Sequence, residues 1–342
     1  MSKKYLISFF AILITFHSIA QTIDSLIRIG NELRNSGSHQ QAINTYRKIF
    51  EYKKNSSLAN YEIAYTYLII NDYKNSIKYS NRVIKAQSEK MIEGYIIKGS
   101  ALDYMRKSKK SIRVYNHAIK LYPNSYLLQY NLGITCYNNN QLANAENNFL
   151  KSIEIDKFQP SSHFMLGLLM NEKKNRVQSM LSLYFFLMLE PNTERSVEAY
   201  KLLMSLWEKN IEVDSTKPNS LRIIYTPKLG GNDFNAIDLS ISSIYASSIG
   251  KKQHGKYDYN LFMSNTLSLF NLIGDFKNVN EDVWHNLYIR FFSNLFINNQ
   301  AELFCYYIST TCDDAIINSW LESNRDRIET FSLWVNENLM NK

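Results

Sequence analysis

A small residue recurs along the first half of the chain with a spacing of 34 residues. This column consists of Gly30, Ala64, Gly99, Gly133 and Gly167, with one inserted residue near Met91. The period divides the chain into five units, 23–56, 57–90, 92–125, 126–159 and 160–193. A fixed period of this length is typical of stacked copies of one supersecondary unit, none of which can bury its apolar face alone. The spacing therefore predicts a repeat array over residues 23–193.

Further columns recur with the same period. A second small column, twelve residues after the first, reads Ala42, Ser76, Ser111, Ala145 and Ser179. A large column four residues later reads Tyr46, Ser80, Tyr115, Phe149 and Leu183, with Ser80 as the departure. Pro123 and Pro191 close two of the units, where a helix must end.

In its 34-residue period and its recurring columns, the chain resembles the tetratricopeptide-repeat family over residues 23–193. The resemblance implies that each unit is a helix–turn–helix hairpin and that the hairpins stack into a right-handed superhelix. It also implies that the first small column marks a close approach of two helices. The fold class predicted for the whole chain is all-α.

The family resemblance also implies a concave groove, lined by the second, fifth, ninth, twelfth and thirteenth residues of each unit. The matching positions include Ile27, Asn31, Arg34, Tyr61, Tyr65, Leu68, Ile96, Ser100, Asp103, Tyr104, Tyr130, Ile134, Tyr137, Phe164, Leu168 and Asn171. Such an aromatic and apolar surface suits an extended or helical peptide. The alternative is that the C-terminal domain folds back and fills the groove as ordinary core. The Lys and Asn pair of the family's carboxylate-clamp branch is missing, which disfavours a co-chaperone of that type.

The first twenty residues have the pattern of a secretory signal peptide. Lys3 and Lys4 precede an apolar run over residues 5–16, and small residues follow at 18–20. The run is shorter than the roughly 20 residues of a membrane span, although a buried first helix is the alternative. We therefore predict an exported mature chain that begins at Gln21. It would be periplasmic or associated with the cell surface, without a lipid anchor and without a transmembrane segment.

Charge is distributed unevenly along the chain, whose net charge is +8. Residues 23–193 carry 23 Lys and Arg against 13 Asp and Glu, whereas residues 194–342 carry 14 against 18. The densest basic patch consists of Arg106, Lys107, Lys109, Lys110 and Arg113. It could contact an anionic envelope surface or an acidic partner, or it could be a solvated turn. Because export would separate the chain from cytosolic RNA and DNA, no nucleic-acid partner is predicted.

The second half of the chain lacks the 34-residue period. Residues 194–212 are predicted to form a capping helix on the array, with an apolar stripe of Val197, Tyr200, Met204, Trp207 and Ile211. Residues 213–232 contain Pro218, Pro227 and a Gly pair, and they are predicted to be a linker with one short strand near 221–225. Residues 233–342 show helical patterning and are predicted to form a separate helical domain without a family signature.

Motifs for catalysis are missing from the sequence. There is no phosphate-binding loop, H-E-x-x-H, G-x-S-x-G or C-x-x-C pattern, so no enzyme class, cofactor or metal is predicted. His285 and Cys305 lie among apolar residues and are interpreted as core, and Asp313-Asp314 as a helix N-cap. Cys305 and Cys312 are about 10 Å apart on one continuous helix, so a disulfide would require a break between them.

The function predicted from the sequence is that of an exported protein-interaction module or scaffold. It would bind a peptide or partner protein through the concave groove of the repeats. The alternative is an envelope enzyme with an unrecognised active site in residues 233–342.

Overall fold

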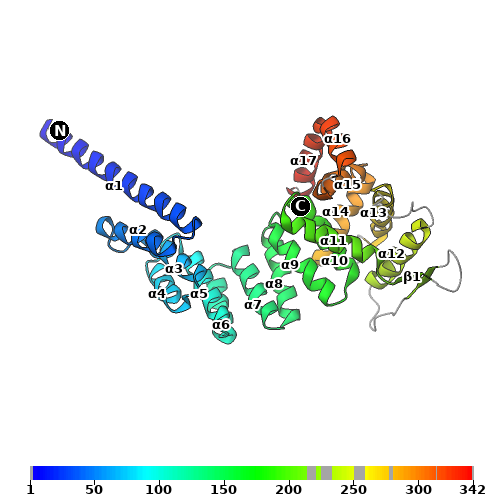
Figure 1. The fold of residues 1–342 in the computed structure, drawn as a ribbon, viewed down its shortest axis with the longest axis horizontal. Helices are drawn as coiled ribbons and strands as arrows, with labels where there is room; N and C mark the ends of the chain where they lie inside the picture. Colours follow the sequence, from blue (N-terminus) through cyan, green and yellow to red (C-terminus); the bar gives the residue numbers. More distant parts are fainter. Residues whose placement is uncertain are drawn as a thin grey trace. The chain divides into compact units, whose positions relative to one another are not determined.

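The computed structural model describes residues 3–213, 221–224, 233–249, 259–276, 280–312 and 314–340, with side chains from residue 19 onward except at 213, 233 and 249. The chain divides into two compact units, Met1–Ile155 and Asp156–Lys342. Within the described residues both are built from helices, apart from one short pair of strands (Figure 1). The predicted all-α class is therefore confirmed.

The first unit consists of four helical hairpins, one in each of the first four predicted repeats. The helices are α1 (Lys3–Asn35), α2 (His39–Tyr52), α3 (Ser57–Ile69), α4 (Tyr73–Lys85), α5 (Met91–Tyr104), α6 (Ser108–Leu121), α7 (Tyr126–Asn138) and α8 (Leu142–Ile155). The predicted signal peptide falls in the first part of α1, where side chains lie outside the described part of the structure. Its removal stays a prediction.

The small column marks a close approach of the two helices of each hairpin, as the sequence predicts. A Cβ added to Gly99 would lie 2.3 Å from the ring of Tyr115, and one added to Gly133 would lie 2.6 Å from the ring of Phe149. An aromatic ring in the large column therefore requires a glycine at the matching position of the first small column. Where the large column has Ser80, the small column has Ala64, and both side chains are buried without conflict.

The second small column adds a hydrogen bond beside this contact. In three hairpins a serine of the second helix donates to the carbonyl oxygen of the small residue in the first helix. The pairs are Ser76 to Ala64 at 2.9 Å, Ser111 to Gly99 at 2.8 Å and Ser179 to Gly167 at 2.8 Å. A bond of this kind satisfies a buried hydroxyl and contributes about 1 kcal/mol.

The turn within each hairpin has one residue in the left-handed conformation, at the same position of all five repeats. These residues are Gly37 (φ 82°), Asn71 (62°), Arg106 (58°), Asn140 (57°) and Lys174 (59°). Gly and Asn adopt this conformation readily, whereas other L-residues lose roughly 1–2 kcal/mol there. Arg106 and Lys174 therefore occupy these turns at a conformational cost.

The second unit begins with a fifth hairpin and continues into the C-terminal helices. Its elements are α9 (Pro160–Glu172), α10 (Arg176–Leu189), α11 (Glu194–Glu208), β1 (Ile211–Val213), β2 (Leu221–Ile223), α12 (Asp233–Ile249), α13 (Tyr259–Ile273), the 3₁₀ turn η1 (Gly274–Phe276), the π-helical segment η2 (Trp284–Ile289), α14 (Arg290–Ile297), α15 (Ala301–Ser309), the 3₁₀ turn η3 (Thr310–Cys312), α16 (Ala315–Ser323) and α17 (Arg325–Met340). The two strands are antiparallel, with Ile211 opposite Ile223.

Helix α10 is the central element of the second unit. Its thirteen residues from Arg176 to Met188 are all buried, because α11, α12, α15 and η2 pack around it as well as α9. A helix that is apolar on every side belongs in a core. The fifth repeat therefore belongs to the same compact unit as the C-terminal helices, whereas the sequence pattern alone groups it with the first four.

The predicted cap and linker differ from the structure in their bounds. Helix α11 ends at Glu208, four residues before the predicted end, and Asn210 then adopts a left-handed φ of 69°. The short strand predicted near 221–225 is β2. The remainder of the predicted linker, 214–220 and 225–232, lies outside the described residues.

Two buried polar side chains join elements of the second unit. Arg176 donates to the carbonyl oxygens of Leu206 at 2.7 Å and Trp207 at 3.0 Å, and to Ser242 Oγ at 2.7 Å. It also pairs with Asp238 at 3.2 Å. The guanidinium thus satisfies the last carbonyls of α11 and links them to α12.

His163 is the second buried polar anchor. Its Nε2 lies 2.9 Å from the carbonyl oxygen of Lys157, and its Nδ1 lies 2.7 Å from the hydroxyl of Tyr288. Because a carbonyl oxygen can only accept, Nε2 carries the proton and Nδ1 accepts from the tyrosine. Burial lowers the pKa of His163 to about 4, so the ring is neutral at pH 7.

The three cysteines are free thiols. Cys305 lies on α15 and Cys312 lies in the following 3₁₀ turn, so the two residues do not share one continuous α-helix. Burial raises the pKa of the Cys136 thiol to about 11. Asp314 caps α16 by accepting from the backbone N–H groups of Ile316 and Ile317, as predicted for this acidic pair.

We expect Gly133→Ala to destabilise the first unit by about 1–3 kcal/mol, because the new methyl group would overlap the ring of Phe149. In the Phe149→Ser background the same change should cost much less, as in the natural Ala64 and Ser80 pair. Urea unfolding followed by circular dichroism measures both costs as a double-mutant cycle. Equal costs in the two backgrounds would contradict the close-approach explanation.

The second unit should lose stability as the pH falls from about 6.5 to about 4. In this range the unfolded chain protonates His163 and the folded chain does not, so stability is full above the unfolded pKa and lost below it. The loss should reach about 3 kcal/mol. All four tryptophans lie in the second unit, so their fluorescence during urea unfolding measures it. His163→Gln should flatten the dependence, and the exposed His117→Gln should leave it unchanged.

Candidate functional site

The predicted groove residues of the first unit lie on the first helices of its hairpins. Helix α3 contacts α5, and α5 contacts α7, so these helices form a continuous row. Tyr65 is 38% exposed and Tyr104 is 57% exposed. Ile27, Asn31, Tyr61, Ile96, Tyr130, Ile134 and Tyr137 are partly exposed, whereas Asp103 is buried. Most of the predicted groove residues therefore reach the surface of the first unit.

Two of the three predicted groove residues of the fifth repeat, Phe164 and Leu168, have a different environment. Phe164 is only 8% exposed, and its ring packs against Phe186 at 4.8 Å under the guanidinium of Arg195. Leu168 is partly buried. Phe164 thus belongs to the interior of the second unit and offers little surface to a ligand.

A pair of stacked tyrosines, Tyr61 and Tyr65, forms one end of the row. Their rings are parallel within 2°, with centroids 6.2 Å apart. Arg34 lies 5.1 Å from the ring of Tyr65, and the ammonium of Lys90 lies 5.5 Å from the ring of Tyr61. Arg34 is itself paired with Glu62. These cation–π contacts fix the two rings from both sides.

Buried tyrosine hydroxyls hold the polar residues of the row. The hydroxyl of Tyr46 donates to Asn31 Oδ1 at 2.8 Å. The hydroxyl of Tyr115 lies 3.0 Å from Ser100 Oγ and 3.1 Å from the carbonyl oxygen of Ile96. Burial raises the pKa of Tyr46 to about 12, so this hydroxyl remains a neutral donor. The same side chains that fill the hairpins therefore also orient the exposed surface.

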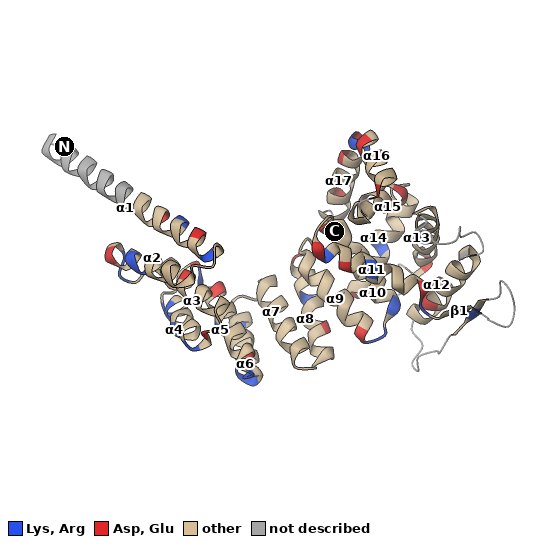
Figure 2. Cartoon of the chain, in the orientation of Figure 1, with Lys and Arg blue, Asp and Glu red and all other residues tan. Residues whose placement is uncertain are grey.

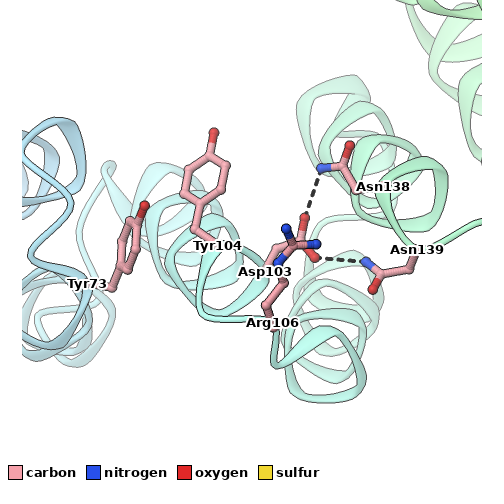
Figure 3. A pocket seen from close by; sticks show the side chains of 6 residues that line it. All are labelled: Tyr73, Asp103, Tyr104, Arg106, Asn138 and Asn139. Atoms are coloured by element: carbon pink, nitrogen blue, oxygen red, sulfur yellow. Dashed lines mark hydrogen bonds between the residues drawn. The ribbon is translucent and has the colours of Figure 1, made fainter.

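A polar pocket of about 300 Å³ lies where the row meets the hairpin turns (Figure 3). It is lined by residues from three consecutive repeats: Tyr73, Asp103, Tyr104, Arg106, Asn138 and Asn139. The amide of Asn138 donates to one oxygen of Asp103 at 3.1 Å, and that of Asn139 to the other at 2.9 Å. The rings of Tyr73 and Tyr104 lie 5.6 Å apart.

Three of these lining residues were not predicted. Tyr104 was assigned to the groove and Arg106 to the basic patch, and the structure places both in one pocket. Tyr73, Asn138 and Asn139 carry no family motif. The available signal was their position at the ends of helices beside the left-handed turns of Asn71 and Asn140.

The basic patch lies beside this pocket, on the α5–α6 turn and the first turns of α6 (Figure 2). Arg106, Lys107, Lys109, Lys110 and Arg113 are all exposed. None of the five has an ion pair among the described residues, and the sequence contains no Asp or Glu from 104 to 145. The N-cap of α6 is Lys107, whose side chain makes no capping hydrogen bond, so the positive helix start adds to this field.

Comparison with known families assigns the repeats. A sequence model of the family described as tetratricopeptide repeat matches residues 23–56, 58–90, 92–125 and 127–159. These residues are therefore tetratricopeptide repeats, which confirms the family predicted from the 34-residue period. Tetratricopeptide arrays are scaffolds with an extended concave surface for binding other proteins. The match does not include the fifth hairpin.

Solved structures with similar helical arrays were also found. PilF of Pseudomonas aeruginosa is 18% identical with a TM-score of 0.45, covering 56% of this chain and 90% of PilF. PilW, a type IV pilus biogenesis factor, is 13% identical with a TM-score of 0.44, covering 55% and 92%. YrrB, a repeat protein with an unusual peptide-binding site, is 19% identical with a TM-score of 0.37, covering 54% and 97%. A search of curated proteins gave no match.

No described helix combines the length and hydropathy needed to cross a membrane. Among the described residues, no group of three or more His, Cys, Asp and Glu side chains is arranged to hold a metal ion.

Replacing Arg106 by asparagine should stabilise the first unit by up to about 1 kcal/mol. Asparagine tolerates the left-handed φ of 58° better than arginine does, and it already occupies this position as Asn71 and Asn140. Arg106→Gln is the matched control, because it removes the same charge at the same position while glutamine tolerates the left-handed φ no better than arginine does, so it should gain nothing. Urea unfolding measures both variants, and a destabilised Arg106→Asn protein would show that the arginine side chain stabilises the turn.

Proposed function

We propose that this protein is an exported scaffold whose repeats bind an extended or helical peptide segment of a partner protein along α3, α5 and α7. The observation that carries the proposal is the row of partly exposed tyrosines on these helices, of which Tyr61, Tyr65, Tyr104 and Tyr130 each contact a neighbouring aromatic ring. Tyr61 and Tyr65 are fixed by stacking and by two cations.

Rigid tyrosines suit this role for two reasons. Each ring offers a large contact area with a polar tip, so that it can pack against a side chain and hydrogen-bond to a peptide backbone. A ring already held in its bound orientation also loses little conformational entropy on binding. Asn31 and Ser100, held by buried tyrosine hydroxyls, supply fixed polar groups in the same row.

Export is part of the proposal and rests on the sequence of residues 1–20. It predicts that the mature chain begins near Gln21. The competing function, an envelope enzyme with a site in residues 233–342, has less support. His285 is held by Asp282 at 2.6 Å, and the thiol of Cys305 is fully buried with its pKa raised by that burial.

The groove can be tested with the full mature chain and a displayed peptide library. Peptides selected on the wild-type protein should bind the Tyr65→Ala/Tyr130→Ala variant at least about tenfold more weakly, because buried tyrosines at interfaces typically contribute more than 1 kcal/mol each. Fluorescence polarisation with labelled peptides measures the Kd. Tyr52→Ala is the matched control, since Tyr52 is 48% exposed on α2, a second helix of its hairpin.

Unchanged affinity in the double variant would refute the groove as the binding surface. Circular dichroism of each variant shows whether it remains folded, so that a loss of binding is not confused with unfolding. Mass spectrometry of the protein secreted by its host tests the predicted N-terminus at Gln21.

A further inference from the structure

We propose that the pocket at the third repeat and the adjoining basic patch form a subsite for acidic side chains of the bound peptide. The subsite consists of Tyr73, Tyr104 and Arg106 at the pocket and Lys107, Lys109, Lys110 and Arg113 beside it. The inference rests on the proposed peptide-binding function and adds to it a chemical preference, namely for a segment rich in Glu or Asp.

The first argument is the unbalanced charge. Five exposed cations lie within eight residues, and none is paired with a carboxylate among the described residues. Two cations elsewhere in the first unit have carboxylate partners, since Arg28 pairs with Glu32 at 2.8 Å and Lys90 pairs with Glu93 at 3.0 Å. A concentration of like charge without counter-charges favours binding of an anionic group and speeds its association.

The second argument is the state of Asp103, the single acidic group of the pocket. Both of its oxygens accept hydrogen bonds from Asn138 and Asn139, and the residue is only 8% exposed. The Asp103 carboxylate therefore already has protein hydrogen-bond donors at the wall of the pocket. Arg106 and the hydroxyl of Tyr104 remain the groups that can donate to an entering carboxylate, because the hydroxyl of Tyr73 already donates to Asn71 Oδ1 at 2.8 Å.

The third argument is continuity with the groove. Tyr104 is a predicted groove residue on α5 and also lines the pocket, with 57% of its surface exposed. A peptide that lies along α3, α5 and α7 therefore reaches the pocket without leaving the row. A concave polar site with tyrosine walls fits a discrete side chain, whereas a membrane would require only a flat basic surface. This favours an acidic peptide over an anionic lipid surface.

The strained turn agrees with this assignment. Arg106 has a left-handed φ at a position where three of the five repeats have Gly or Asn. An arginine here is disfavoured for the backbone, and its guanidinium is suited to a carboxylate because its donors can form two parallel hydrogen bonds.

The experiment compares two labelled probe peptides, one carrying several Glu residues and its twin with Gln at the same positions, built on a sequence selected by the groove. The mature wild-type chain should bind the Glu peptide about tenfold more tightly at low salt, and the preference should shrink at high salt. The Lys107→Gln/Lys109→Gln/Lys110→Gln variant should lose most of the preference. The matched control, Lys48→Gln/Lys53→Gln/Lys54→Gln, removes the same charge from exposed residues of the first repeat and should keep it.

Arg106→Asn provides an independent readout. It should weaken binding of the Glu peptide severalfold while leaving binding of the Gln peptide unchanged, and it is expected to be at least as stable as the wild type. Weaker binding in this variant is therefore not a folding defect.

The outcomes separate this inference from the groove itself. Equal affinity for the two peptides, or a full preference in the Lys107/Lys109/Lys110 variant, would overturn the acidic subsite while the groove stands. If the groove is not the binding surface, the Tyr65→Ala/Tyr130→Ala variant would bind both peptides with unchanged affinity. Binding to phosphatidylglycerol vesicles that depends on the same three lysines, together with equal affinity for the two peptides, would assign the patch to a membrane surface instead.

Discussion

Three of the four hairpins of the first unit depend on one contact, in which an aromatic ring of the second helix occupies the space where a Cβ of Gly30, Gly99 or Gly133 would lie. Tyr115 shows how much follows from it. The ring requires a glycine at position 99, and the hydroxyl continues past that glycine to Ser100 and the carbonyl oxygen of Ile96. Packing and surface are thus determined by the same residue. The side chains that fill this hairpin therefore also orient residues at its surface.

The second unit uses a related hairpin for a different purpose. Leu183 approaches Gly167 as the aromatic residues do elsewhere, yet α10 is surrounded on its other sides by C-terminal helices. Two large buried polar side chains of this core have partners, since Arg176 donates to the last carbonyls of α11 and His163 contacts Lys157 and Tyr288. Buried polar groups without such partners would cost several kcal/mol. The hairpin therefore serves as the core of a globular unit.

The sequence predicts the hairpins well because their determinants are local and recur at fixed positions. It predicts the pocket only in part, since Tyr104 and Arg106 were assigned to separate surfaces and Tyr73, Asn138 and Asn139 to none. The pocket joins helix ends from three repeats, at positions where the family requires no particular residue. Phe164 shows the converse limit: its position matches the groove, but Phe186 and Arg195 cover it. Ile211 lies after the end of α11 and pairs with Ile223 between β1 and β2. The helical stripe seen in the sequence includes Ile211 and gives no sign of this pairing.

The burial of α10 also limits how such a protein can change in length during evolution. Repeat arrays gain and lose units by duplication and deletion, which is tolerated where each unit contacts only its neighbours. The first four hairpins meet this condition. The fifth does not, because its second helix contacts segments distant in the sequence. A unit inserted after it would separate α10 from these segments, and deletion of the fifth hairpin would remove part of the core. Variation in the number of repeats should therefore be confined to the part of the chain before Pro160, and the fifth hairpin should be inherited together with the C-terminal helices.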